Sequence, residues 1–409
     1  MSPAQHFSRR LFLKQTAGAT SLLATGLTLP GFLGRTALAS AADGSIDKRI
    51  LVIIQMTGGN DGLNTVIPFR DDRYHRARPT LAIARDRVHD LGNDLGLHPD
   101  MSAFKGLFDD GKLSVITNVG YPNPDRSHFR SMDIWHTALT QPEKAEDGWL
   151  GRVVDRAGER QTPLALHLDD SVLPLALKTQ TQSVPSIASI DSFSLAQRDP
   201  AFDTTLQAAR QAATDDLLYV QRIAVSSVAN ARRLNDVAND NGGSAAGYPQ
   251  FNLANRLRQI AQLIGADFGS RIYYTSYGGF DTHARQILSH GRLLQELSDS
   301  VVAFQRDIEA RGLADRVVVM TFSEFGRRVK ENGSRGTDHG AAAPMFIIGN
   351  NVRAGIIGGR PDLSDEATGD VPFTLDFRQV YASMLEDWLG TRHEAILGAT
   401  FRKAAVLRV

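Results

Sequence analysis

Two short segments each place a carboxylate beside an imidazole, a combination that can bind a divalent metal ion. Asp281 and His283 are separated by one residue, so in an extended backbone their side chains point to the same side. Asp338 and His339 are adjacent, and nearby glycines permit the bend that brings both to one ion. A hard oxygen and a borderline nitrogen favour zinc, manganese or a similar ion, with calcium less suited to the imidazoles. The alternative is that these side chains cap helices and hydrogen-bond loops.

Two more acidic residues follow apolar runs that are typical of buried strands. Asp61 comes after the β-branched run at 49–56, and Glu324 comes after the run at 317–322. Open α/β sheets bind ligands at the carboxyl ends of their strands, so both acids are candidates for a site there. For Asp61 the alternative is a side chain that only bonds turn amides.

Ser127 is the candidate nucleophile. It begins a predicted helix at 127–138, directly after a predicted strand at 112–119. The helix amides, with Arg126 or Arg130, would stabilise an oxyanion formed there. The alternative is that the hydroxyl is an ordinary helix N-cap.

The chain alternates runs typical of strands and of helices. Strands are predicted at 49–56, 112–119, 164–167, 271–276, 317–322 and 344–349, and helices at 101–110, 127–138, 201–235, 252–265, 284–311 and 376–389. This order predicts an α/β fold with a doubly wound, mostly parallel sheet flanked by helices. We expect one domain over 40–409, with 200–266 as a helical insert or cap. The glycines at 58–59 lack the lysine or third glycine that a nucleotide-binding loop requires.

The composition narrows the class of protein. At 409 residues and 42% hydrophobic content, the chain can bury a large core. It has no cysteine, which excludes disulfides, thiolate metal sites and thiol nucleophiles and suits an oxidising compartment. Four of the 45 cations lie in residues 1–39, so the remainder holds 41 cations against 45 acids. This balance argues against nucleic acid as a partner.

Residues 1–39 have the features of an export signal. Arg9 and Arg10 form a twin-arginine pair, an apolar run follows at 16–33, and Ala37-Leu38-Ala39 is a small-x-small cleavage pattern. The alternative is an N-terminal amphipathic helix. We therefore expect a periplasmic or secreted protein that uses the twin-arginine export machinery, with no membrane span in the mature chain. This route carries proteins that are already folded, often with a metal or cofactor bound. The signal therefore favours a protein with a bound cofactor.

The leader and five motifs resemble a bacterial family, the one called domain of unknown function 1501. The motifs are Thr57–Gly62, Arg126–Phe129, Gly278–His283, Ser323–Arg327 and Gly336–Gly340. The family looks like a branch of the alkaline phosphatase and sulfatase superfamily. Members of that superfamily hydrolyse or transfer phosphate or sulfate esters, using metal ions at the carboxyl ends of a parallel sheet.

The resemblance implies roles for individual residues. Asp61 matches the metal aspartate after the first strand, and Ser127 falls at the position of the nucleophile. Asp281 and His283 fall where one metal receives an aspartate and a histidine, and His339 matches the late metal histidine. The resemblance therefore implies an alkaline phosphatase-like domain with one or two divalent ions.

Two departures from the superfamily pattern stand out. The superfamily usually separates that aspartate and histidine by three residues, whereas one residue lies between Asp281 and His283. Its Asp-His pair normally follows the strand equivalent to 317–322, where this chain has Ser323-Glu324. Asp338-His339 can be aligned with that pair instead, but strand order favours the first mapping.

Our first hypothesis is an exported hydrolase of a small anionic phosphate or sulfate ester that depends on zinc, manganese, magnesium or calcium. The nucleophile would be Ser127 or a metal-bound water. The expected residues are Ser127, Arg126 and His128 for catalysis, Arg130, Arg327 and Asn60 for substrate binding, and Asp61, Asp281, His283, Glu324, Asp338 and His339 for metal. The second hypothesis is a non-catalytic exported scaffold or binding protein that retains the fold, with or without one structural ion, and a third is an oxidoreductase with an organic cofactor.

Overall fold

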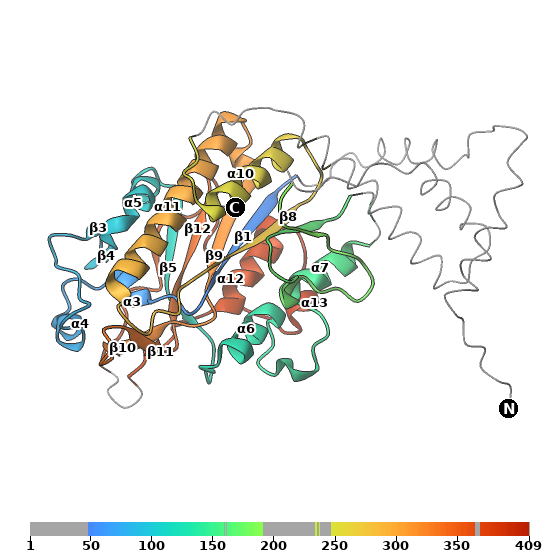
Figure 1. The fold of residues 1–409 in the computed structure, drawn as a ribbon. Coiled ribbons are helices and arrows are strands. Elements are labelled where there is room, and N and C mark those ends of the chain that lie inside the picture. Colours follow the sequence, from blue (N-terminus) through green and yellow to red (C-terminus); the bar gives the residue numbers. More distant parts are fainter. Residues whose placement is uncertain are drawn as a thin grey trace, which may run out of the picture. The chain divides into compact units, whose positions relative to one another are not determined.

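Nine strands form one large sheet in the described part of the chain (Figure 1). The computed structural model describes residues 48–158, 160, 162–190, 234, 237, 247–364 and 369–408. The strand order is β13-β5-β12-β9-β1-β8-β6-β7, and β14 also pairs with β5. The bounds are β1 Ile50–Thr57, β5 Leu113–Gly120, β6 Ala165–Leu168, β7 Ser186–Ile187, β8 Ile272–Gly278, β9 Val317–Phe322, β12 Ala343–Ile348, β13 Gly355–Ile357 and β14 Leu375–Asp376.

The sheet is mostly parallel, as the sequence predicts. β1 lies between β8 and β9 and runs parallel to both, with Leu51 opposite Ile272 on one side and Val318 on the other. Only β12 among these strands runs antiparallel to its neighbours, β5 and β9. No helix crosses over between β9 and β12, so the chain re-enters the sheet from the edge at which β9 ended.

The segment between β9 and β12 forms a ribbon that the sequence reading did not predict. Its strands are β10 (Arg327–Glu331) and β11 (Thr337–His339), paired antiparallel with Arg327 opposite His339. Because β9 ends and β12 begins at the carboxyl edge of the parallel strands, this ribbon keeps His339 at that edge. A second small sheet consists of β2 (Val66–Ile67), β3 (His89–Gly92) and β4 (Leu95–Leu97).

Helices cover both faces of the large sheet. Alternate residues of β1 enter two cores, Val52 with Ile54 in one and Leu51 with Ile53 in the other. The first core includes side chains of α5, α10 and α11, and the second includes side chains of α6, α7 and α12. The longer helices are α5 Ser102–Asp109, α6 His128–Thr137, α7 Trp149–Ala157, α10 Asn252–Gly265, α11 Gln286–Ala310 and α12 Phe377–Ser383. This is the doubly wound arrangement that the alternating pattern predicts.

Short elements complete the described part. The remaining α-helices are α3 Gly62–Thr65, α4 Asp72–Ala77 and α13 Glu394–Leu397, and the 3₁₀ turns are η2 Pro99–Met101, η3 Pro142–Lys144, η4 Leu175–Leu177 and η6 Ala314–Arg316. The predicted closing helix at 376–389 divides into α12 and a π-helical turn, η7 Met384–Trp388. The region 171–190, in which the sequence predicts no strand, also contributes β7 to the sheet.

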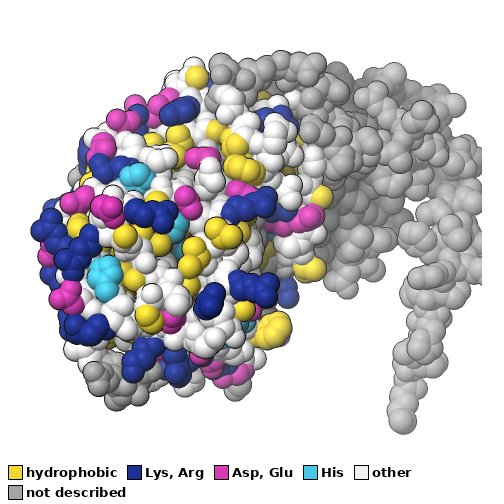
Figure 2. Space-filling model, turned by 60° about the vertical axis from the view of Figure 1, so that its left-hand side comes forward, with side chains coloured by type: hydrophobic (Ala, Val, Ile, Leu, Met, Phe, Trp, Pro, Cys, Tyr) yellow, Lys and Arg dark blue, Asp and Glu magenta, His cyan; other side chains and the backbone are white. Residues whose placement is uncertain are grey.

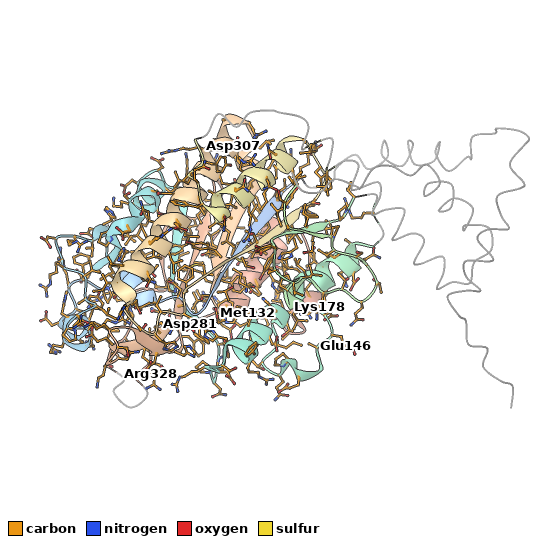
Figure 3. The ribbon with its side chains drawn as sticks, in the orientation of Figure 1. Met132, Glu146, Lys178, Asp281, Asp307 and Arg328 are labelled. Carbon is orange, nitrogen blue, oxygen red and sulfur yellow. The ribbon has the colours of Figure 1, made fainter. Side chains whose placement is uncertain are left out.

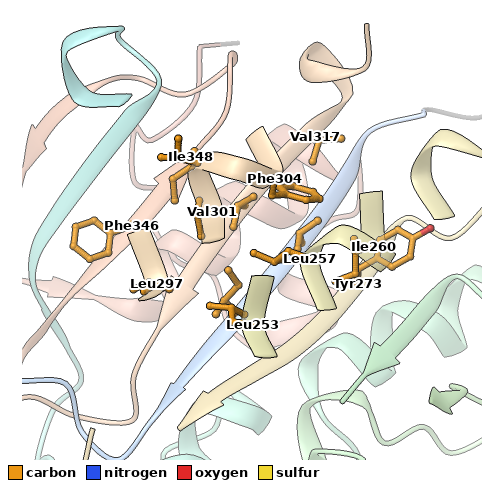
Figure 4. Close-up of a cluster of buried hydrophobic side chains, with 14 of the residues drawn as sticks. Leu253, Leu257, Ile260, Tyr273, Leu297, Val301, Phe304, Val317, Phe346 and Ile348 are labelled. Atoms are coloured by element: carbon orange, nitrogen blue, oxygen red, sulfur yellow. The ribbon is translucent and has the colours of Figure 1, made fainter. Parts of the chain in front are cut away.

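The last helix of the predicted insert is a core element. α10 packs beside α11 over the sheet, and Figure 4 shows Leu253 and Leu257 from α10 with Val301 and Phe304 from α11 in this core. Burying each such side chain contributes about 1.5–3 kcal/mol. The rest of the predicted insert, including the predicted helix at 201–235, lies almost entirely outside the described residues. An insert or cap there stays a prediction, as does the extent of the domain.

No helix in the described ranges has the length and apolarity needed to cross a membrane. On the face seen in Figure 2, basic and acidic side chains are interspersed with smaller groups of hydrophobic ones. The predicted export signal at 1–39 lies outside the described residues.

Candidate metal centre

Glycines let the loops at the carboxyl ends of β1 and β8 approach each other closely. Gly58 follows β1 with a φ of +120°, and a Cβ there would collide with the backbone nitrogen of Asp281. The Phe280 amide donates to the Thr57 carbonyl at 3.2 Å, which ties the two strand ends together. Asp281 therefore lies at the carboxyl edge of the sheet, in the lower half of Figure 3.

Three histidines from different elements surround the Asp281 carboxylate. The Oδ1 of Asp281 lies 3.0 Å from the Nε2 of His283, 3.3 Å from that of His339 and 3.5 Å from that of His128. His128 begins α6, His283 follows β8, and His339 ends β11. The structure thus brings together Asp281, His283 and His339, which the sequence predicts as metal ligands, and adds His128, which the sequence assigns to catalysis.

The spacing of these atoms suits a metal ion. His128, Asp281 and His339 each offer a ligand atom, and these atoms lie within 4.8 Å of one another. Ligands about 2.0–2.1 Å from a tetrahedral zinc ion are themselves about 3.3 Å apart, close to the separations from Asp281. His283 joins the group through Asp281 and His339, since its Nε2 lies 2.9 Å from the Nε2 of His339.

The second nitrogen of each ring has its own oxygen acceptor. His128 donates from Nδ1 to Oε1 of Glu324 at 2.8 Å. His339 donates from Nδ1 to the backbone carbonyl of Arg126 at 2.8 Å. His283 donates from Nδ1 to Oδ1 of Asp338 at 3.3 Å. Metal-binding histidines are held in this way, with the acceptor fixing the tautomer and the ring orientation.

This tautomer assignment aims three Nε2 lone pairs at the Asp281 carboxylate. Two facing lone pairs on His283 and His339 repel each other unless a cation or a proton lies between them. Three imidazole nitrogens and one carboxylate oxygen form a donor set that binds zinc or manganese, so the residues present fit such an ion. Glu324 and Asp338, predicted as metal ligands, instead contact the Nδ1 atoms of His128 and His283 and orient those two rings.

Charges around the cluster shift its pKa values. Burial acts to raise the pKa of Asp281, but the hydrogen bond from Arg327 and the positive charge of its guanidinium outweigh it and lower the pKa to about 2. The hydrogen bond to Glu324 raises the pKa of His128. Burial lowers the pKa of His339, which favours the neutral ring that a metal requires.

Arg327 is the one guanidinium in contact with the cluster among the described residues. It donates to Oδ1 of Asp281 at 2.7 Å and to the Thr337 and Gly59 carbonyls, both at 2.7 Å. It also donates to the Gly58 carbonyl. Its side chain has no exposed surface. These bonds hold the loops of the site together and leave the guanidinium little freedom to meet the substrate predicted for it.

The predicted nucleophile lies at the rim of the cluster. Ser127 is exposed and directly precedes His128, and its hydroxyl makes no capping hydrogen bond to α6. The helix start is held instead by the Ser127 amide, which donates to Oδ1 of Asp125 at 2.7 Å. The N-cap alternative therefore does not account for the hydroxyl.

Arg126, predicted to be catalytic, and Arg130 and Asn60, predicted to bind substrate, lie in different surroundings. Arg126 is 41% exposed and forms an ion pair with Asp370. Arg130 pairs with Glu143. Asn60 is completely buried, and its Oδ1 accepts a hydrogen bond from Thr65 at 2.9 Å. Of the three, Arg126 alone has an exposed side chain next to the cluster.

Asp61 is the predicted ligand that the structure keeps apart from the histidines. Its side chain is fully buried, and Oδ2 accepts from Nη1 of Arg78 at 2.6 Å and from the amide of Gln286. Burial acts to raise the pKa of Asp61, but the Arg78 charge outweighs it and lowers the pKa. An arginine in this position supplies the positive charge that a metal would otherwise supply.

A second group of potential ligands, Glu386, His393 and Glu394, has the wrong donor set for a metal. The Nε2 of His393 accepts the Phe401 amide at 3.0 Å, so Nδ1 carries the proton and donates to Glu386 at 2.7 Å. The ring has no lone pair left for an ion. Lys403 lies 3.5 Å from Glu386 and further balances its charge.

The fold and the histidine cluster define an α/β protein with a candidate metal centre at the carboxyl edge of its sheet. The chain belongs to the family described as "Protein of unknown function (DUF1501)", whose model matches residues 47–400. This confirms the family resemblance read from the five motifs. No curated protein matches the chain.

Solved structures of low similarity come from the alkaline phosphatase and sulfatase superfamily. The PsFucS1 sulfatase from Pseudoalteromonas sp. is 11% identical, with 91% of this chain and 76% of that chain covered and a TM-score of 0.39. A protein in the alkaline phosphatase superfamily from Vibrio parahaemolyticus is 8% identical, with 87% and 71% covered and a TM-score of 0.39. The C-terminal periplasmic domain of EcEptC from Escherichia coli is 9% identical, with 85% and 84% covered and a TM-score of 0.38. Likenesses this low say nothing about activity.

Proposed function

We propose that this protein is a metal-dependent hydrolase of a phosphate or sulfate ester. The observation that carries the proposal is the convergence of three imidazole Nε2 atoms on Asp281, with each Nδ1 already bonded to an oxygen. His128, His283, His339 and Asp281 would hold the ion. A bound divalent ion would supply positive charge that polarises the ester and offsets the negative charge of the transition state.

The chain's own residues position and receive the anionic ester. The Ser127 hydroxyl stands beside His128 at the rim, free of any helix-capping bond. Arg126 is next to it, and the guanidinium donors that do not contact Asp370 can bind ester oxygens. Arg327 acts at a distance from the ester, because it fixes Asp281 and the loops around it.

Either of two nucleophiles can attack the ester. In transfer, the Oγ of Ser127 bonds to phosphorus or sulfur as the ester bond breaks, and the proton lost by the hydroxyl ends on the leaving alcohol. Water then cleaves the serine ester, which releases phosphate or sulfate and restores the hydroxyl. In direct hydrolysis, water takes the place of Ser127 in the first step.

A non-catalytic binding protein is the second candidate, and Arg327 is the observation that favours it. Its Nη1 lies 3.4 Å from the Nε2 of His283, and its Nη2 bonds to Asp281. A guanidinium so close to the ligand atoms lowers the affinity for a cation. As a binding protein, the chain would retain the alkaline phosphatase-like fold and would hold its ion weakly or for a structural purpose.

A screen with matched variants tests the proposal. Protein loaded with zinc, manganese, magnesium or calcium is incubated with aryl phosphates, phosphodiesters and aryl sulfates. His339→Ala should abolish turnover and metal binding, whereas His75→Ala should change neither, since the His75 ring bonds to the Phe69 carbonyl outside the cluster. Ser127→Ala should abolish transfer but leave the metal bound. Ser102→Ala, an exposed serine at the start of α5, is its control.

The outcomes separate the two candidates. Turnover that survives Ser127→Ala assigns the attack to water. No turnover of any of these esters by protein that contains stoichiometric metal contradicts the hydrolase and supports the binding protein.

We also propose that residues 1–39 direct the chain through the twin-arginine route to the periplasm or the medium. The support is the Arg9-Arg10 pair and the Ala37-Leu38-Ala39 pattern. Replacing both arginines by lysine keeps the charge but removes the guanidinium pair, so uncleaved precursor should accumulate in the cytoplasm. Normal export of the double variant would contradict this proposal.

A further inference from the structure

The exposed large apolar side chains of the described ranges belong to one edge of the sheet. They are Phe129, Val172, Ile287 and Leu288. The first is in the segment that follows β5, the second in the segment after β6, and the last two in the segment after β8. β6 and β8 run parallel to β1, and so does β5, because β12 is antiparallel to both β5 and β9. All four side chains therefore lie in segments that leave the carboxyl edge, where the candidate metal centre is.

Phe129 borders the centre at the start of α6. It directly follows His128, whose Nε2 lies 3.5 Å from Oδ1 of Asp281. Because His128 points toward the cluster, the next side chain is turned about 100° around the helix, and 87% of Phe129 is exposed. Ser127, on the other side of His128, is exposed too. The candidate nucleophile and an exposed aromatic ring thus flank one histidine of the cluster.

The first turn of α11 borders the centre from the loop that carries His283. Gln286 is buried, and its Oε1 accepts a hydrogen bond at 3.1 Å from Thr282, the residue before His283. Since Gln286 points inward, the side chain two positions later is turned about 200° around the helix and faces outward. This side chain is Leu288, which is 84% exposed, and Ile287 beside it is 46% exposed.

These apolar side chains adjoin a centre that is suited to an oxyanion. Figure 3 shows Asp281 between α6 and the start of α11. A ligand whose oxyanion head reaches the candidate ion therefore extends outward past Phe129, Leu288 or both. One exposed apolar side chain is ordinary, but several beside a candidate site indicate a binding surface. Packing against an apolar body would remove them from water, whereas a polar body such as a sugar would gain little from them.

We propose that the metal centre binds amphiphilic anions, and that the ester hydrolysed there has an aryl or alkyl body that packs against Phe129 and Leu288. This inference rests on the proposed function, since it takes the oxyanion head to be held at the cluster. It adds the class of substrate and two residues that determine specificity.

Alkylphosphonates test the inference without hydrolysis, because their carbon–phosphorus bond is not an ester. Methylphosphonate carries the head with almost no apolar body, and hexylphosphonate adds an alkyl chain. Calorimetric titration uses full-length protein loaded with manganese and desalted. The Kd of hexylphosphonate should be at least about tenfold lower than that of methylphosphonate. A phosphonate with an ether chain of similar length should bind no more tightly than methylphosphonate.

Substitutions assign this preference to the apolar side chains. The readout is the Kd of methylphosphonate divided by that of hexylphosphonate. Phe129→Gln and Leu288→Gln should each lower this ratio at least about threefold. Both side chains are exposed, so the variants should fold. Val172→Gln is the matched control and should leave the ratio unchanged, because Val172 is 87% exposed but follows β6, which β8 separates from β1.

Four results would overturn the inference. One is a parent protein that does not prefer hexylphosphonate, and another is a preference that neither Phe129→Gln nor Leu288→Gln lowers. The third is hexylphosphonate binding that is unchanged in His339→Ala, which would place the probe away from the cluster. The fourth is sedimentation with phosphatidylglycerol vesicles that Phe129→Gln abolishes, in a protein without the hexyl preference. That result would assign the apolar side chains to a membrane surface.

The binding experiment and the ester screen can fail separately. A hexyl preference that Phe129→Gln and Leu288→Gln lower, in a protein that turns over no ester, supports the amphiphile site and contradicts the hydrolase. Ester turnover by a protein without the preference contradicts the amphiphile site alone.

Discussion

The Nδ1 atom of His128 lies 2.8 Å from Oε1 of Glu324, a carboxylate with no exposed surface. The same oxygen accepts the Gly58 amide at 2.8 Å, and Oε2 accepts the Ser323 hydroxyl at 3.1 Å. Glu324 thus joins the start of α6, the end of β1 and the end of β9 at one point. His128 is therefore oriented toward Asp281 by a group that is itself fixed from two sides.

Glu324→Gln should weaken metal binding about 10–100-fold without removing a ligand. The amide keeps the shape of the side chain but loses the charge that orients His128 and strengthens its hydrogen bond. For the same reason the pKa of His128, which Glu324 raises, should fall. Competition with a chelator measures the affinity, and NMR titration of the metal-free protein measures the pKa.

Glu331→Gln is the matched control for this change. Its carboxylate also accepts backbone amides, those of Thr80 and Leu81, but none of these groups contacts the histidine cluster. Metal affinity should be unchanged in the control. Equal affinity in Glu324→Gln and the parent protein would show that the Glu324 contact does not orient a ligand.

Removing metal should lower the melting temperature of the parent protein. An ion that binds only the folded state stabilises it by about 2.7 kcal/mol when its free concentration is 100 times Kd. Chelation should reverse this gain, and zinc or manganese should restore it. In His339→Ala the chelator should have no effect, because two of the contacts in the cluster run through that ring. His75→Ala should respond like the parent, and a melting temperature that never responds to chelation would exclude the site.

The sequence predicts the frame of the site better than its details. The β-branched run at 49–56 forms β1. His283 and His339 lie together, as expected for residues near the ends of neighbouring strands. Both results depend on local pattern and on a general rule of parallel sheets. The position of His128, directly after the serine that the sequence singles out, could also have suggested it as a ligand.

The partners of buried charged residues could not be predicted from the spacing of residues along the sequence. Asp61 stands at a strand end as predicted, yet its partner is Arg78, which reaches it only through the packing of α4 and its following turn. Likewise β12 reverses direction because the β10–β11 ribbon replaces a crossover helix. Neither the ribbon nor the ion pair has a local sequence signal, because each depends on tertiary contacts.

Breaking the Arg78–Asp61 pair should cost about 3–5 kcal/mol of unfolding free energy. Both side chains are fully buried, and Arg78 also donates to the Val329 and Arg328 carbonyls, which anchor β10. Arg78→Met leaves the Asp61 charge buried without a partner. The double variant Arg78→Met with Asp61→Asn should recover part of the loss, because the unpaired charge is then gone. Denaturant unfolding of metal-free protein measures both.

An exposed pair is the control for this substitution. Arg85 lies 2.6 Å from Asp72, but both side chains are more than half exposed. Arg85→Met should change the unfolding free energy by no more than about 1 kcal/mol. A similar cost for Arg78→Met and Arg85→Met would mean that burial does not strengthen the Arg78–Asp61 pair.

Buried neutral histidines should make the metal-free protein sensitive to mild acid. Burial lowers the pKa of His136 and His290 to about 3 and the pKa of His98 and His167 to about 4. In the unfolded chain these rings titrate near pH 6.5. Between pH 6.5 and pH 4 the unfolded state therefore binds more protons, and the free energy of unfolding falls as the pH falls.

The size of this effect follows from the number of titrating rings and from the direction in which folding shifts the pKa of each. Each buried histidine contributes a slope of at most about 1.4 kcal/mol per pH unit. His128 has a raised pKa and acts in the opposite sense, since its contribution is present below pH 6.5 and is lost as the pH rises through the folded value. Burial also lowers the pKa of His339 in the metal-free protein, so five rings act against one and stability is lost in acid. Denaturant unfolding from pH 8 to pH 4 measures the slope, which should become shallower in His136→Gln, where one buried ring is gone. Unfolding free energy that stays level from pH 7 to pH 5 would show that these rings can be protonated in the folded protein.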